Sequence, residues 1–336
     1  MSKRQITIAI DAMGGEDSPF KNIKGTEIFS RIHPEVNLKI FGNEEKIFET
    51  IKKNKITLTN FELVHCDENI SDEDKTHTIL RSRKKSSMFQ GLTYVKENLD
   101  SGFVSAGNTG ALMILSRLIL GMIEGVNRPA ICSNIPNKKS FSLMLDLGAN
   151  VYVTAENLLQ FALMGYAYFS IIDPKRKPKI GLINIGTENN KGLEFLQEAH
   201  DLISKSFLKS EFLGFIEPNK ITHGICDIIL SDGYTGNIIL KTAEGLSGFI
   251  TSNLRDVYTK STKNKLAYKL LANDLKIFKN QIDPDEYNGA TFLGINGISV
   301  KSHGNANPYA FSCAINKCYD FIINDLNKKI KENFKY

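Results

Sequence analysis

The chain has 336 residues, of which 42% are hydrophobic, and its formal net charge at pH 7 is +5. A chain of this size can bury a large core, either as one α/β unit or as two closely packed subdomains. The five cysteines show no CxxC spacing, so we expect reduced thiols and no metal site. The longest apolar stretch, residues 111–123, contains Arg117 and is too short to span a bilayer. No signal-peptide pattern precedes the first predicted strand, and we expect a cytoplasmic protein.

Short apolar runs alternate along the chain with segments whose apolar residues recur at helical spacing. The strand-like runs are residues 6–10, 38–41, 61–65, 103–105, 141–146, 179–185, 227–231 and 298–301. The helical segments include residues 87–99, 111–123, 156–171 and 192–205. This alternation predicts one domain over residues 1–336, with a mainly parallel sheet and helices on both faces. The turn-rich segment 173–178 is the expected link between two lobes.

Many of the predicted apolar runs end in small and polar residues. These turns are residues 11–15, 105–110, 145–150, 184–188, 231–237, 294–297 and 301–304. A parallel sheet presents the carboxyl ends of its strands at one edge, and ligands bind there. The sequence therefore predicts that these turns together form the rim of one active site.

The turn after Ser105 has the features of an anion site. It passes through Gly107 and Gly110 into an apolar helix, whose first N–H groups have no backbone partner. Asn108 and Thr109 add side-chain donors at the same place. The sequence contains neither a GxGxxG dinucleotide fingerprint here nor a Walker loop. An ordinary strand-to-helix turn has the same composition, and at this point both interpretations stay open.

A basic segment lies near the carboxyl-terminal third of the chain, where residues 255–280 carry seven basic and two acidic side chains. Within residues 259–282 the apolar side chains fall on one face of a predicted, protruding amphipathic helix, with lysines on the other face. Such a helix packs on the core, contacts a second subunit or binds an anionic membrane surface. No stripe of aromatic and basic residues accompanies it, which argues against a nucleic-acid partner.

These motifs in this order resemble those of the PlsX-type phosphate acyltransferases of bacterial phospholipid synthesis. The resemblance extends from Ile6 to about Phe321 and also includes segments 84–88 and 128–130. It implies a three-layer α/β/α Rossmann-like fold of the isocitrate/isopropylmalate-dehydrogenase type, with two intertwined subdomains beside a cleft. It also implies transfer of a fatty acyl group from acyl carrier protein to inorganic phosphate, which gives acyl phosphate.

Acyl transfer from a thioester to phosphate needs a bound and partly desolvated phosphate, donors for the oxyanion, and a tolerated or protonated thiolate. No protein nucleophile is required, and the sequence has no GxSxG elbow and no cysteine in a motif turn. We therefore predict direct attack of phosphate on the thioester. The expected phosphate site combines the turn of Asn108, Thr109 and Gly110 with Gly14 and Gly15, which let a second backbone segment approach the ligand.

Lys301 and His303 are two residues apart at a strand end, so they point to the same face and combine a fixed cation with a proton-transfer group. Together with Asp232 they form the expected catalytic group, Asp232 by orienting a loop at the acyl side. The other polar residues of the turns are expected to orient loops or to bind substrate: Asp11, Asn184, Glu188, Asn237 and Asn296. We expect neither a metal nor another cofactor.

Other functions share parts of this pattern. A short-chain acyl-CoA phosphotransacetylase has the same fold and reaction type and differs in the acyl carrier. A decarboxylating dehydrogenase would need a cluster of acidic metal ligands, which the sequence does not show, and a non-catalytic lipid-surface scaffold would not need the turns. The expected partners are acyl carrier protein, inorganic phosphate, a second copy of the chain, and an anionic membrane or a membrane-bound acyltransferase.

Overall fold

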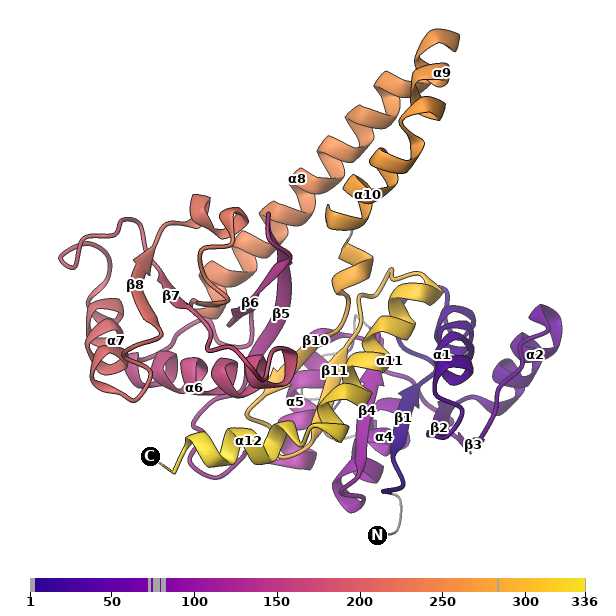
Figure 1. The fold of residues 1–336 in the computed structure, drawn as a ribbon. Coiled ribbons are helices and arrows are strands. Elements are labelled where there is room, and N and C mark those ends of the chain that lie inside the picture. Colours follow the sequence, from indigo (N-terminus) through magenta and orange to yellow (C-terminus); the bar gives the residue numbers. More distant parts are fainter. Residues whose placement is uncertain (1–3, 72–73, 75–78, 80–82, 283, 336) are drawn as a thin grey trace.

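The computed structural model describes residues 4–71, 74, 79, 83–282 and 284–335. Within these residues, eleven strands form one sheet that crosses the molecule (Figure 1). In spatial order the strands are β3 (Phe61–His65), β2 (Asn37–Gly42), β1 (Thr7–Asp11), β4 (Ser101–Ser105), β11 (Ile298–Lys301), β10 (Ala290–Leu293), β5 (Ala130–Pro136), β6 (Phe141–Leu145), β9 (Ile228–Leu230), β7 (Ile180–Ile183) and β8 (Phe212–Ile216).

The strands fall into two parallel groups that run in opposite directions. The first strand group is β3, β2, β1, β4 and β11, and the second is β6, β9, β7 and β8. Between them, β10 is antiparallel to β11 and to β5, and β5 is antiparallel to β6. The last residues of β11 and β6 lie almost level in the sheet, because Val300 is paired with Thr291, Thr291 with Cys132, and Cys132 with Leu145. The antiparallel strands in the middle reverse the chain direction, so the loops after the two groups leave the sheet in opposite directions. The single rim stays a prediction.

Helices cover both faces of the sheet. The helices of the described residues, including those that project from the sheet, are α1 (Phe20–Ile32), α2 (Glu44–Asn54), α4 (Ser87–Glu97), α5 (Thr109–Leu120), α6 (Ala155–Ile172), α7 (Glu194–Lys205), α8 (Gly233–Thr259), α9 (Thr262–Leu270), α10 (Ala272–Ile282), α11 (Pro308–Ile323) and α12 (Leu326–Asn333). Two short 3₁₀ turns lie at Pro218–His223 and Pro284–Tyr287.

The core is divided by the sheet into two apolar clusters. In β1, Ile8 and Ile10 belong to the cluster that includes side chains of α1, α6 and α11, whereas Ala9 belongs to the cluster of α4 and α5. Successive side chains of a strand point to opposite faces, so one buried strand supplies both clusters. The three-layer α/β/α fold expected from the sequence is confirmed.

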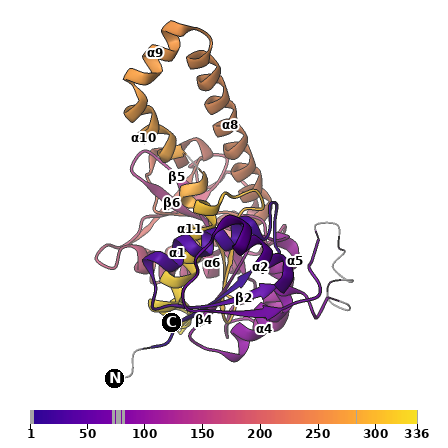
Figure 2. The same cartoon turned by 90° about the vertical axis from the view of Figure 1, so that its right-hand side faces the viewer.

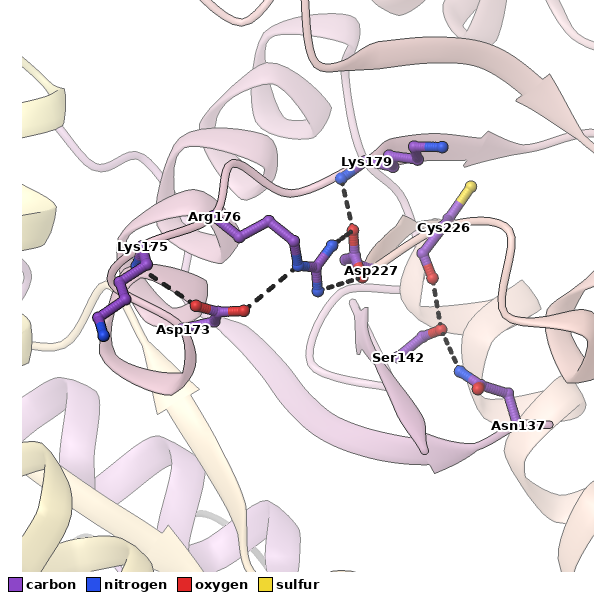
Figure 3. Close-up of polar contacts among 8 residues, drawn as sticks. All are labelled: Asn137, Ser142, Asp173, Lys175, Arg176, Lys179, Cys226 and Asp227. Atoms are coloured by element: carbon purple, nitrogen blue, oxygen red, sulfur yellow. Dashed lines mark hydrogen bonds and ion pairs between the residues drawn. The ribbon is translucent and has the colours of Figure 1, made fainter. Parts of the chain in front are cut away.

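The chain does not pass between the strand groups at residues 173–178. This segment joins α6 to β7, both packed with the second strand group. Arg176 donates to both carboxylate oxygens of Asp227 at 2.7 and 2.9 Å, and the backbone N–H of Lys179 donates to Asp227 at 2.7 Å (Figure 3). The charged segment is therefore fixed to the start of β9. The chain crosses instead through the central strands β5 and β10.

A pair of helical arms projects from the sheet (Figures 1 and 2). One arm is α8 and the other is α9 followed by α10. Residues 259–282 are thus two helices, not the single helix expected. Ser261 caps α9 by accepting from the N–H of Asn264 at 3.2 Å, and Leu271 is the C-cap after the last residue of α9, Leu270. The apolar side chains are exposed, Leu270 by 80% and Leu266 by 60%. In the part of the chain that the structure describes, no helix is long and apolar enough to cross a membrane.

Candidate active site

Three elements of the first strand group meet at the carboxylate of Asp11. The hydroxyls of Ser87 and Ser105 donate to it at 2.7 and 2.6 Å, and the backbone N–H of Met13 donates at 3.0 Å. Ser87 begins α4 and Ser105 ends β4, so Asp11 joins the ends of two neighbouring strands to a helix N-terminus. Burial raises the pKa of Asp11, and the four hydrogen bonds of its site oppose this rise. These contacts are those of a residue that fixes loops.

Two glycine-containing loops pack against each other above Asp11. A Cβ atom on Gly14 would lie 2.5 Å from the N of Gly107 and 2.6 Å from Oδ2 of Asp11. A Cβ on Gly15, whose φ is +81°, would lie 2.9 Å from the carbonyl oxygen of Ala106. Only glycine permits this approach. The structure therefore brings Gly14 and Gly15 beside the turn after Ser105, as the sequence predicts, and we call residues 13–15 and 105–110 the cradle.

Asn108 begins the helix of the cradle. Its side-chain oxygen accepts from the N–H of Ala111 at 2.9 Å, so it is the N-cap of α5. Thr109 and Gly110 follow in the first turn, and both are exposed. The positive end of the helix dipole therefore lies at an exposed part of the cradle, where an anion could reach it.

Lys301 and His303 lie on the same edge as the cradle. Lys301 is paired in register with Ser105, and its ammonium donates to the carbonyl of Ala106 at 3.4 Å and to that of Ser302. The backbone N–H of His303 donates to Asn288 at 3.0 Å. Burial lowers the pKa of His303, as do Lys301, Lys241 and Lys317, while Glu244 opposes them. The imidazole is therefore neutral near pH 7 and suited to accept a proton.

A second buried carboxylate, that of Asp146, organises the other strand group. It accepts from the N–H groups of Ile131, Ala149 and Asn150 at 3.0, 3.0 and 2.7 Å. Burial raises the pKa of Asp146. Asp146 was not among the predicted site residues, although it follows an apolar run and is soon followed by a glycine, as Asp11 is, a signal that could have identified it.

Asp232 and Asn237 lie next to Asp146. Asp232 is the N-cap of α8 and accepts from the N–H of Thr235 at 2.8 Å. A Cβ on Gly148 would lie 3.6 Å from the Cβ of Asn237, so the Asp146 turn packs on the first turn of α8. The contacts of Asp232 cap a helix, and its expected place in the catalytic group stays a prediction.

Two further predicted residues, Asn184 and Glu188, lie in a different loop, the one after β7. Asn184 is buried after β7, where its amide donates to the carbonyl of Lys191 at 2.9 Å. Glu188 is on the same loop and forms an ion pair with Lys191 at 2.7 Å, which lowers the pKa of Glu188. Lys191 is a cation of this loop that was not predicted, although its i,i+3 spacing from Glu188 is visible in the sequence.

Asn296 lies elsewhere, in the turn between β10 and β11. Its N–H donates to the carbonyl of Gly121 at 2.9 Å, and it lines a cavity of about 360 Å³ with Arg4 and Lys331. Because β11 begins here and ends at Lys301, this turn is at the opposite edge from the cradle. Its assignment to the same rim as Lys301 is wrong. Among the described residues, no group of three or more His, Cys, Asp or Glu side chains is arranged to hold a metal ion.

Comparisons with known proteins identify the family. The family model described as "Fatty acid synthesis protein" matches residues 6–329. The phosphate acyltransferase of Pelagibacter ubique is 38% identical over 329 residues, which is 98% of each chain. The chain belongs to the PlsX-type phosphate acyltransferase family. The phosphate acyltransferase of Parvibaculum lavamentivorans is 40% identical over 328 residues, 97% of this chain and 91% of the relative. The resemblance seen in the motifs is confirmed, and the protein is an acyltransferase.

Solved structures share the fold. EutD phosphotransacetylase from Staphylococcus aureus matches with a TM-score of 0.60 and 13% identity, and covers 97% of this chain and 94% of its own. A phosphotransacetylase from Streptococcus pyogenes matches with a TM-score of 0.61 and 14% identity, and covers 95% and 94%. At this identity the likeness concerns the fold alone.

The role of Asp11 generates a stability prediction. Asp11→Asn keeps the volume of the side chain, but it removes the charge and replaces one acceptor oxygen by a donor. We expect the free energy of unfolding in urea to fall by about 1.5–3 kcal/mol, the usual range for hydrogen bonds to a charged group. Asp201→Asn, at a side chain 70% exposed, is the matched control and should be nearly neutral. Equal losses in the two variants would contradict the linking role of Asp11.

Proposed function

We propose that this acyltransferase moves a fatty acyl group from acyl-acyl carrier protein to inorganic phosphate, giving acyl phosphate for phosphatidic acid synthesis. Family membership over nearly the whole chain carries this proposal. The cradle supports it, because two glycine loops, a helix N-terminus and the ammonium of Lys301 together suit a small dianion. The alternative, a short-chain acyl-CoA phosphotransacetylase, has only the shared fold in its favour.

Phosphate attacks the thioester directly in this proposal. An oxygen of phosphate forms a bond to the acyl carbon, and the bond to sulfur breaks as the carrier thiolate leaves and is protonated. The state of four of the five cysteines supports the absence of an acyl-enzyme on them. Burial raises the pKa of Cys66, Cys132 and Cys226 to about 12, and that of Cys318 is raised as well. A buried thiol that stays protonated is a poor nucleophile.

Lys301 and His303 act on the phosphate side. The fixed charge of Lys301 holds phosphate against the cradle and stabilises the negative charge that develops in the transition state. The neutral imidazole of His303 accepts the proton of a monoprotonated phosphate and returns it to the leaving thiolate. Asp232 and Asn237 position the start of α8, and Asn184 and Glu188 shape the loop after β7.

The projecting arms supply contacts with partners other than the substrates. Exposed apolar side chains along α8, among them Leu246, Phe249 and Val257, support a homodimer formed through this arm. Exposed lysines and apolar side chains on α9 and α10 support reversible contact with an anionic membrane. An acyl phosphate is insoluble and hydrolysis-prone, so release at the bilayer brings it directly to a membrane-bound acyltransferase.

The decisive assay measures phosphate-dependent release of carrier-protein thiol from a palmitoyl-loaded carrier, run beside palmitoyl-CoA. We expect release that requires phosphate, and a kcat/KM for the carrier thioester well above that for the CoA thioester. Preference for CoA thioesters would favour the phosphotransacetylase alternative. Loss of the thioester without formation of acyl phosphate would contradict both.

Asn108 allows a test of the cradle that keeps the helix cap. Asn108→Asp retains a good capping oxygen but places a negative charge at the phosphate site. We expect the apparent KM for phosphate to rise by a factor that corresponds to roughly 1–3 kcal/mol. The matched control is Asn43→Asp, at the N-cap of α2, where Asn43 accepts from the N–H of Lys46 at 3.0 Å. If both variants keep the wild-type KM for phosphate, the cradle does not bind phosphate.

The pH profile tests His303. Because burial lowers its pKa, His303 should be neutral and active at neutral pH and become protonated and inactive as the pH falls through that lowered pKa. The kcat at saturating phosphate is measured for wild type and His303→Gln between about pH 5 and 8. We expect the ratio of wild type to variant to rise with pH and then level off. The titration of phosphate itself cancels in this ratio, and a constant ratio would exclude proton transfer by His303.

Vesicle binding tests the arms. Leu271→Asp with Phe278→Asp should abolish cosedimentation with anionic vesicles and leave thiol release in solution unchanged. Each lysine near the surface contributes on the order of 1 kcal/mol at low salt, so wild-type binding should weaken as salt is added. Leu118→Asp with Phe48→Asp makes the same changes at exposed sites away from the arms and should keep binding. If the wild type does not bind vesicles at low salt, the membrane proposal is wrong, and these side chains would instead contact protein.

A further inference from the structure

Lys21 is a buried lysine in the first turn of α1. Its side chain is 1% exposed, and its ammonium donates to the carbonyl oxygen of Gly304. Among the described residues, the ion pairs do not include Lys21, although Glu16 and Asp17 are close enough to favour its charge. Burial lowers the pKa of Lys21, which reflects the cost of holding a cation there. An ammonium in such a place is stabilised mainly by an anion that binds next to it.

The ammonium of Lys21 reaches the cradle. A Cβ on Gly15 would lie 2.7 Å from Nζ of Lys21 and 2.9 Å from the carbonyl oxygens of Ala106 and Gly304. The carbonyl of Ala106 also accepts from Lys301. The two ammonium groups thus approach the same pair of turns, Lys21 from α1 and Lys301 from β11.

The charges of the cradle explain why a second cation is useful. A phosphate near neutral pH carries up to two negative charges, and the carboxylate of Asp11 lies directly below the two glycine loops. Lys301 by itself supplies one positive charge against these. We propose that Lys21 is a second phosphate-binding cation of the cradle and sets the affinity for inorganic phosphate. This inference rests on the proposed function, since it assumes that phosphate occupies the cradle.

The neighbouring residue already performs the structural task that Lys21 would otherwise have. The side-chain amide of Asn22 donates to the carbonyl oxygens of Asp11, Ala12 and Gly14 at 3.1, 3.1 and 2.9 Å. Asn22 therefore fixes the first cradle loop to α1 without any charge. An ammonium has three donors, and a neutral side chain would suffice to reach Gly304 alone.

The test compares Lys21→Met with Lys24→Met, a change on the same helix at a lysine paired with Glu27. Three quantities are measured: the KM for phosphate and the KM for acyl carrier protein in the thiol-release assay, and the rise in Tm caused by inorganic phosphate against chloride at equal ionic strength. For Lys21→Met we expect at least a tenfold higher KM for phosphate, a smaller phosphate-induced rise in Tm, and a KM for acyl carrier protein within threefold of wild type. Lys24→Met should match wild type in all three.

If Lys21→Met folds and keeps both the wild-type KM for phosphate and the wild-type rise in Tm with phosphate, the inference is overturned. Lys21 would then only hold the carbonyl of Gly304 in place. Should this variant not fold, Lys21→Arg and Lys21→Gln take its place: the arginine variant should keep the response to phosphate and the glutamine variant should lose it. Equal responses of the two would also overturn the inference. Failure of the proposed function looks different, because the wild type itself would then release no thiol on addition of phosphate.

Discussion

The hydrogen bonds to the buried carboxylate of Asp11 are the constraint on which the candidate site depends. A buried carboxylate is costly unless its oxygens are paired, and here two serine hydroxyls and a backbone N–H provide the pairing. The partners come from three separate segments, so satisfying the charge also fixes where those segments meet. The glycines above Asp11 then allow the two loops to touch, and the ammonium of Lys301 contacts the second loop at the carbonyl of Ala106.

The second strand group repeats this design with Asp146. Its carboxylate is saturated by N–H groups of its own turn and of β5, and the turn supports the N-terminus of α8. From there α8 runs past the central strands and continues into the projecting arm (Figure 1). On the way, the charge of Glu244 raises the pKa of His303 and the charge of Lys241 lowers it. One helix therefore joins the Asp146 turn, the surroundings of His303 and the arm that we propose contacts the membrane or a second copy.

Much of the fold could be predicted because hydrophobic runs and helical spacing are local signals. Most predicted strands and helices, such as residues 61–65 and 192–205, agree with the structure within a few residues. The strands β5, β8 and β10 were missed. The direction of the second strand group could not be predicted either, because the reversal depends on the pairing of β5 and β10, which are far apart in the chain. That pairing also explains why the turn of Asn296 lies at the other edge.

The candidate site was predictable only in part. Glycine turns at strand ends are visible in the sequence, and Gly14, Gly15 and Asn108 do lie together. The burial of Lys21 is not visible, because a lysine at the start of an amphipathic helix ordinarily points to solvent. Its position results from the packing of α1 against α11, a contact between residues almost 300 positions apart. The charged side chains around the cradle are therefore placed by tertiary packing, whereas the turns of its backbone follow from local sequence.

A crystal structure of the protein with inorganic phosphate tests the central claim most directly. The account predicts phosphate bound between the loops of Gly14–Gly15 and Asn108–Gly110, accepting from backbone N–H groups there and lying within ion-pair distance of Lys301. Phosphate bound at another place, with the two glycine loops in contact only with each other, would contradict it.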